Sequence, residues 1–130
     1  MIKAVVTNPE GLADWVEFVT KGTDIFSTDH CGYWLRGVAH GTMGWLGWED
    51  DEEHRFDHEP DRGAALAAWQ DSKPLPPGWF RLDEALAQKA WEIGLKKFGE
   101  HWYDEGDSTT YLYAFDVVLQ LALLGEVRYG

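Results

Sequence analysis

The chain has 130 residues, of which 45% are hydrophobic and 15% aromatic, so it is long enough to bury the core of one domain. Its 23 acidic residues outweigh 11 Lys and Arg and give a formal net charge of −12, which argues against binding to nucleic-acid backbones or anionic membranes. The only cysteine, Cys31, cannot form an intrachain disulfide or a zinc cluster of several thiolates. No stretch resembles a signal-peptide core or a membrane span, so we expect a cytoplasmic protein.

The first part of the chain predicts a short strand, a helix and a hairpin. Residues 2–6 are typical of a strand, and Asn8 followed by Pro9 is typical of a helix start. The apolar residues Leu12, Trp15, Val16 and Val19 then recur at helical spacing and predict one apolar face. We expect the helix to end at Lys21 and Gly22. Two aromatic runs interrupted by glycine, residues 33–36 and 43–48, predict the strands of a hairpin that turns near residues 39–42.

A short helix and an extended connection are expected next. Asp61 is placed to cap a helix over residues 62–70. The prolines of residues 73–78 preclude both a helix and a central strand there. We expect Trp79 and Phe80 to anchor this connection to the core.

Two longer helices follow. Asp83 is expected to cap a helix that continues to about Phe98 and ends at Gly99. The last helix starts at Asp107 or Ser108 and reaches about Leu124, and residues 126–130 predict a final short strand. The apolar stripe of this last helix is the widest in the chain, so we expect one face to be buried and one edge, at Asp116 and Gln120, to be exposed to solvent. The residues expected on the buried face are Phe115, Val118, Leu121 and Ala122.

Together these elements predict a single α+β domain over residues 1–130, with a small antiparallel sheet packed on three to four helices. Three of the eight tryptophans, Trp15, Trp69 and Trp91, lie on helix faces and are expected in the core. Trp45 and Trp48, in the hairpin, are the best candidates for exposed aromatic side chains.

The strongest functional signal is a concentration of acid. Residues 49–61 hold eight Asp and Glu and one Arg, so eight minus one gives −7, more than half of the net charge of −12. Such a segment resists burial and attracts cations or basic surfaces. We therefore expect a surface that binds a basic protein partner, formed by Glu49, Asp50, Asp51, Glu52 and Glu53 with Trp45 or Trp48 as an apolar anchor.

A divalent metal site is the alternative for the same segment. His54 and His58 are four residues apart, so on a helix their imidazoles would share a face, and Asp57 could complete the site. Arg55 stands where the zinc-protease motif requires a glutamate, and the spacing of a calcium-binding loop is absent. A solvated acidic loop with incidental histidines explains the pattern as well, and without this site we expect no cofactor.

Enzymatic motifs are weak elsewhere, so a non-enzymatic protein is favoured. His30 and Cys31 are adjacent, and neighbouring residues on a strand point in opposite directions, so this histidine is poorly placed as a base and Cys31 is expected to pack as a small residue. Neither a phosphate-binding glycine loop nor a Gly-x-Ser-x-Gly motif occurs.

Residues 32–37, 106–111 and 121–130, 22 of the 130 residues, are similar to segments of small uncharacterised proteins of bacteriophages and prophages. The resemblance implies an origin in a mobile element and hence a bacterial or phage-infected cytoplasm. Short acidic proteins that block a host's nucleic-acid-binding machinery are one known class of mobile-element protein. The resemblance assigns no activity and no functional residue.

Three classes of function therefore remain open. They are an acidic interaction protein, monomeric or homodimeric; a metal-binding module or metal-dependent enzyme at His54 and His58; and a tryptophan-based sugar-binding module, which the helix-rich pattern disfavours.

Overall fold

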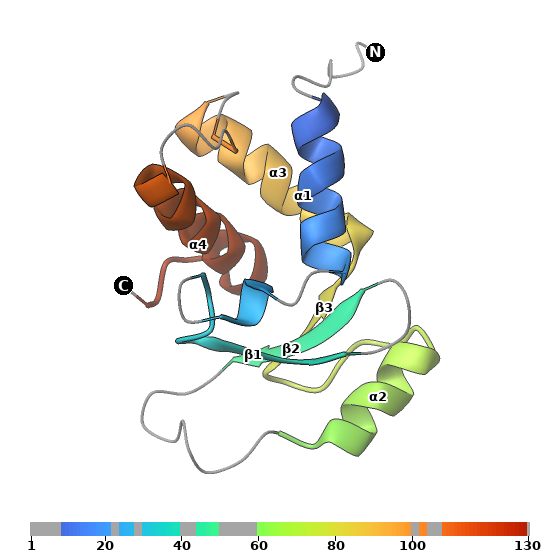
Figure 1. Ribbon diagram of the computed structural model, residues 1–130. Helices are drawn as coiled ribbons and strands as arrows, with labels where there is room; N and C mark the ends of the chain where they lie inside the picture. Colours follow the sequence, from blue (N-terminus) through green and yellow to red (C-terminus); the bar gives the residue numbers. More distant parts are fainter. Residues whose placement is uncertain are drawn as a thin grey trace.

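The computed structural model of the chain describes residues 9–21, 24–27, 30–39, 44–49, 60–99, 102–103 and 108–129, with the backbone alone for residues 108–113. A three-stranded antiparallel sheet and four α-helices confirm the predicted α+β class (Figure 1). In chain order the elements are α1 (Pro9–Lys21), the 3-10 turn η1 (Asp24–Phe26), β1 (Leu35–Ala39), β2 (Trp45–Glu49), α2 (Arg62–Gln70), β3 (Trp79–Leu82), α3 (Glu84–Phe98) and α4 (Ser108–Leu124).

The helix ends follow the local sequence signals. Asp61 accepts a hydrogen bond from the Ala64 N–H at 3.1 Å, and Asp83 accepts one from Leu86 at 2.9 Å, so both predicted caps are confirmed. Gly99 ends α3 with a φ of 96°, a left-handed conformation that glycine adopts without strain. The predicted strand over residues 2–6 and the caps at Asn8 and Asp107 lie outside the described residues.

The sheet has the strand order β1-β2-β3, with both pairs antiparallel. The predicted hairpin is confirmed, with β1 beginning at Leu35, two residues later than expected. The prediction missed β3: residues 79–82 form a strand rather than only the end of a connection, because they pair with β2 in a register that sets Trp79 opposite Trp48. Four residues are too few for a hydrophobic period to identify a strand.

The predicted strand over residues 126–130 is wrong for its described part. Residues 127–129 form no strand, because the main-chain N–H groups of Arg128 and Tyr129 donate to the side-chain oxygen of Gln120, each at 2.8 Å, instead of to a neighbouring strand. The end of the chain therefore folds back onto α4.

Helices cover both faces of the sheet. Figure 1 shows the strands between α2 on one side and the three helices α1, α3 and α4 on the other. Alternation along the strands assigns Leu46 and Trp79 to the α2 face, where they enclose Ala65 in a small apolar cluster. Leu35 and Leu82 point to the opposite face and join the main core.

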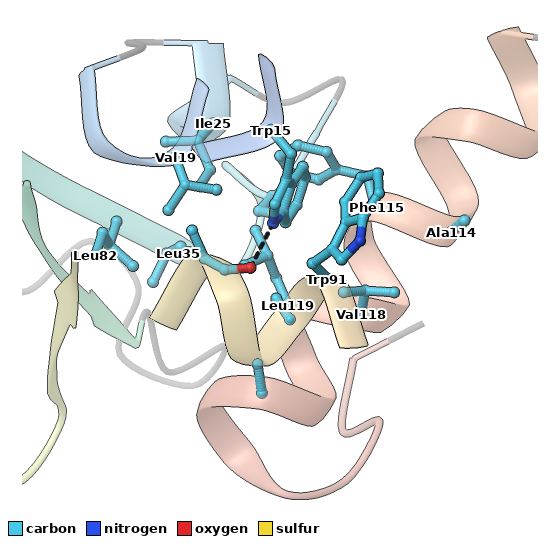
Figure 2. Close-up of a cluster of buried hydrophobic side chains, with 14 of the residues drawn as sticks. Trp15, Val19, Ile25, Leu35, Leu82, Trp91, Ala114, Phe115, Val118 and Leu119 are labelled. Atoms are coloured by element: carbon cyan, nitrogen blue, oxygen red, sulfur yellow. Dashed lines mark hydrogen bonds between the residues drawn. The ribbon is translucent and has the colours of Figure 1, made fainter. Parts of the chain in front are cut away.

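The main core is dense in aromatic rings. Trp15 is fully buried, and its ring lies edge-on to Phe115 and Trp102, with centroids 5.0 Å away in each case. Figure 2 shows Trp15, Trp91 and Phe115 packed together, and a dashed line marks the bond from Trp15 to the backbone of α3. Burial of Trp15 and Trp91 confirms their predicted place, whereas Trp69 is only half-buried.

The predicted faces of α4 need a correction. Phe115, Val118 and Ala122 are buried as expected, but Leu121 is only half-buried. Gln120, expected at a wet edge, is completely buried, since the returning residues 126–129 cover its side of the helix. Within the described part of the chain, no helix is both long and apolar enough to span a membrane.

Candidate functional site

The two described ends of the acidic segment lie close together. The Glu49 N–H donates to the Gly78 carbonyl at 2.9 Å, which positions the end of β2 beside the residue that precedes β3. Pro60, where the described chain resumes, also lies beside Gly78, since its Cγ is 3.9 Å from the place a Cβ would take on that glycine. The segment therefore leaves and rejoins the fold at the same end of the sheet.

Glu49 is the one predicted acidic partner-binding residue that the structure describes, and its carboxylate is engaged within the chain. Arg128 Nη1 lies 2.7 Å from Glu49 Oε1, and the Tyr129 hydroxyl donates to the same oxygen. The hydrogen bond and the charge of Glu49 raise the pKa of Arg128 above its usual value. Glu49 is therefore paired within the chain. Asp50, Asp51, Glu52 and Glu53 lie outside the described residues, so their contribution stays a prediction.

The two tryptophans predicted as anchors lie on opposite faces of the sheet. Trp45 faces the main core, where its ring is edge-on to Phe26 with centroids 6.0 Å apart. Trp48 faces the α2 side and packs on Trp79, with centroids 5.0 Å apart. Both are half-buried, and only Trp48 lies on the face that α2 covers.

The residues of the predicted metal site, His54, Asp57 and His58, lie outside the described residues, so the structure leaves that site as a prediction. Over the residues that are described, His, Cys, Asp and Glu nowhere gather in a group of three or more suited to a metal ion.

Cys31 packs as a small core residue, as predicted. It is completely buried, and this burial, with the nearby charge of Asp116, raises the pKa of its thiol well above the usual value. The His30 ring nitrogen Nδ1 is within 2.8 Å of the Ser27 hydroxyl, and the ring packs edge-on to Phe115. A buried thiol that holds its proton is a poor nucleophile, because the thiolate is the reactive form.

A polar network that the sequence did not reveal lies behind Glu49. The Asp116 carboxylate accepts hydrogen bonds from the Trp34 indole at 2.8 Å, from Gln120 at 3.0 Å and from the Tyr33 hydroxyl. Gln120 also donates to the Tyr129 carbonyl at 2.8 Å, and the Tyr129 ring stacks on Trp34. We call these five residues the Gln120 network.

The Gln120 network holds parts of the fold together and contains no activated nucleophile or base. Burial and the hydrogen bond and charge of Asp116 raise the pKa of Tyr33, so its hydroxyl stays protonated and serves as a donor. Because the network ends at Tyr129, which bonds Glu49, it connects α4 to the start of the acidic segment. Its bonds from Tyr33 and Trp34 to Asp116 join residues 83 and 82 positions apart, which no local pattern in the sequence could reveal.

A groove between α1 and α3 is the second feature that sequence reasoning missed. It has a volume of about 430 Å³, within the range of ligand-binding clefts. Its lining residues come from one stripe of α1 and from the start of α3: Pro9, Leu12, Ala13, Val16, Glu17, Thr20, Lys21, Glu84 and Gln88. Leu12 and Val16 were predicted on the apolar face of this helix, but they are only half-buried and lie at its border.

The described surface thus offers charge and apolar area rather than a reactive group. The thiol of Cys31 is buried in the core, and the described carboxylates lie mainly at the surface. Comparison of the chain with protein families, curated proteins and solved structures finds no match to any of them.

Proposed function

We propose that this chain is a non-enzymatic interaction protein that binds a basic protein partner through its acidic segment, residues 49–61. An origin in a phage or mobile element and a place in the bacterial cytoplasm, where the partner would be a nucleic-acid-binding protein, belong to the same proposal. The observation that carries it is a net charge of −7 within thirteen residues (eight acids minus one Arg), whose described ends, Glu49 and Pro60, both lie beside Gly78.

The way the segment is anchored supports this function. Its first carboxylate, on Glu49, is compensated by Arg128 and Tyr129, so the start of the segment is attached to the body of the protein. Asp61, the last acid of the segment, caps α2, so the acids that we assign to the partner are those between Glu49 and Asp61. A basic partner suits them, because burying an unpaired carboxylate is costly. Like charges held close together raise the local potential and speed the encounter with a basic surface.

Trp48 supplies apolar area next to these charges. It is half-buried, packs against Trp79 with the two rings tilted by 50°, and directly precedes Glu49. In protein interfaces charge sets the encounter rate and specificity, whereas a partly exposed aromatic residue that becomes buried supplies affinity. The partner that fits is therefore a basic surface with a small apolar patch.

The test is a salt-dependent binding experiment with the full chain. Proteins captured from a bacterial lysate at about 50 mM salt and released at about 500 mM, where charges are screened within a few ångströms, are identified and purified. The affinity of each purified candidate is then measured with a variant in which Asp50, Asp51, Glu52 and Glu53 are all changed to Ser.

The matched control changes four exposed acids elsewhere to Ser: Asp24, Asp71, Glu92 and Glu126. The two variants have the same net charge, so a general loss of charge affects them equally. We expect the first variant to lose at least about tenfold in affinity and the control to change little. Equal losses, or binding that does not weaken with salt, would show that the segment is not the binding site.

A further inference from the structure

The groove between α1 and α3 has an apolar floor. Leu12, Ala13 and Val16 line it from α1, and the two helices are joined beneath it by the bond from Trp15 to Ala87. Ala13 is exposed and Leu12 and Val16 are half-buried, so this apolar stripe is open to a ligand. Apolar area that is left half-covered between two packed helices gains stability when another apolar group covers it.

Carboxylates border this floor on both sides. Along α1, Glu10, Asp14 and Glu17 recur at i, i+4 and i+7 and are all exposed, so they form one acidic edge beside the stripe. On the opposite side Glu84 is exposed at the first turn of α3, where it accepts a hydrogen bond from Gln88 at 3.2 Å. Among the described residues that line the groove itself, Glu17 and Glu84 are acidic and Lys21 is basic, so the lining carries −1. Glu10 and Asp14 add negative charge beside it.

We propose that this groove is a docking site for a basic amphipathic segment of a partner protein, whose apolar side chains occupy the floor while its Lys or Arg side chains reach Glu17 and Glu84. The inference rests on the proposed function for the sign of the partner's charge, and it adds a second surface and the pattern of the sequence recognised there. An apolar stripe with acidic edges is complementary to a helix that has an apolar stripe with basic edges.

The groove's size fits one face of such a segment. A volume of about 430 Å³ accepts a few aliphatic side chains and is too small to enclose a whole helix. The partner would therefore lie along the surface of α1 and α3, and its basic side chains would remain near solvent. Binding should then depend on both apolar contact and salt.

The probe is a synthetic peptide of about 14 residues, roughly four helical turns, in which Leu occupies one face and Lys the other. Two control peptides separate the contributions: one has Ser in place of every Leu, and the other has Glu in place of every Lys. Amide chemical shifts of the isotope-labelled full chain are followed during titration with each peptide. We expect the Leu and Lys peptide to shift α1 and the start of α3, and both control peptides to bind at least about tenfold more weakly.

Two variants of the chain test the residues. Ala13→Trp fills the groove from an exposed position, and Glu17→Lys with Glu84→Lys reverses the charge of its edges. The control pair, Asp24→Lys with Asp71→Lys, makes the same charge change at exposed positions outside the groove. We expect at least about tenfold weaker binding for the first two and little change for the control, with circular dichroism showing that all three remain folded.

The outcomes separate this inference from the proposed function. Shifts confined to residues 49–61, or equal binding of the peptide without Leu, would overturn the groove as a docking site and would leave the acidic segment as the binding surface. Shifts in the groove that disappear in the groove variants, together with unchanged partner binding by the Asp50 to Glu53 variant, would support the groove and count against the segment. No binding of the Leu and Lys peptide at low salt would also overturn the groove.

Discussion

The indole N–H of Trp15 donates a hydrogen bond of 2.7 Å to the main-chain carbonyl of Ala87, which joins α1 to α3 inside the core. Trp15→Phe would remove this donor and part of the ring volume, while the replacement would remain apolar. We expect a loss of about 2–4 kcal/mol in the free energy of unfolding, from the lost bond and the cavity together. Urea unfolding measures it. A loss below about 0.5 kcal/mol would show that the core relaxes around the smaller ring.

Gln120→Leu should destabilise the protein although it replaces a polar residue in the core with an apolar one. The side-chain amide accepts from the N–H groups of Arg128 and Tyr129 and donates to Asp116, so these groups would lose their partner. Each unsatisfied buried group costs about 1–3 kcal/mol. Amide exchange of Arg128 and Tyr129 should accelerate in parallel. Gln88→Leu, at an exposed position on α3, is the control and should change the stability by less than about 0.5 kcal/mol.

Gly94→Ala should reverse the usual effect of this substitution in a helix. Alanine normally gains about 1 kcal/mol over glycine inside a helix. At Gly94, however, a Cβ would lie 2.3 Å from the Trp102 ring, so the ring would have to move, and overpacking costs about 1–3 kcal/mol. Gly63→Ala in α2 is the comparison, since the nearest atom to its Cβ would be 3.6 Å away. Thermal unfolding should show a lower midpoint for Gly94→Ala and an equal or higher one for Gly63→Ala.

Stability should fall as the solution becomes alkaline. The pKa values of Cys31 and Tyr33 are both raised in the folded protein, chiefly by burial, so the native state keeps protons that the unfolded chain releases. The stabilisation is complete below the unfolded thiol pKa of about 8.5 and is lost as the pH rises towards the folded value. Unfolding free energies between about pH 8 and 10 measure this slope. Cys31→Ala should flatten it, and an identical slope in that variant would exclude the thiol as a cause.

Local signals predicted the helices well because their ends are encoded within a few residues. Asp61 and Asp83 cap helices in the structure as their positions predicted, and Gly99 ends α3. The pairing of β3 with β2 depends on contacts across some 30 to 40 positions, which no local period records. The return of residues 126–129 depends on bonds to Gln120, eight and nine positions away, and to Glu49, 80 positions away. Gln120 looked like a surface residue for the same reason: the atoms that bury it come from the end of the chain.

The candidate binding surfaces also have features that the local sequence predicts and features that depend on distant contacts. The charge of residues 49–61 can be read directly from the sequence, but the pairing of Glu49 with Arg128 and Tyr129 cannot. Strand alternation alone could have separated Trp45 from Trp48, since residues three apart on a strand point to opposite faces. The α1–α3 groove required the packing of two helices that lie far apart in the chain, and the amphipathic pattern of α1 assigned Leu12 and Val16 to the core instead.

The contacts of Arg128 and Tyr129 also bear on the order of folding during synthesis. A ribosome makes Glu49 and Trp34 about 80 and 95 residues before Tyr129, so their partner is missing while most of the chain emerges. Contacts of such wide separation form late and slowly, because the intervening chain loses entropy before they are made. Until Arg128 and Tyr129 bind Gln120 and Glu49, the polar side of α4 lacks the residues that cover it in the folded protein.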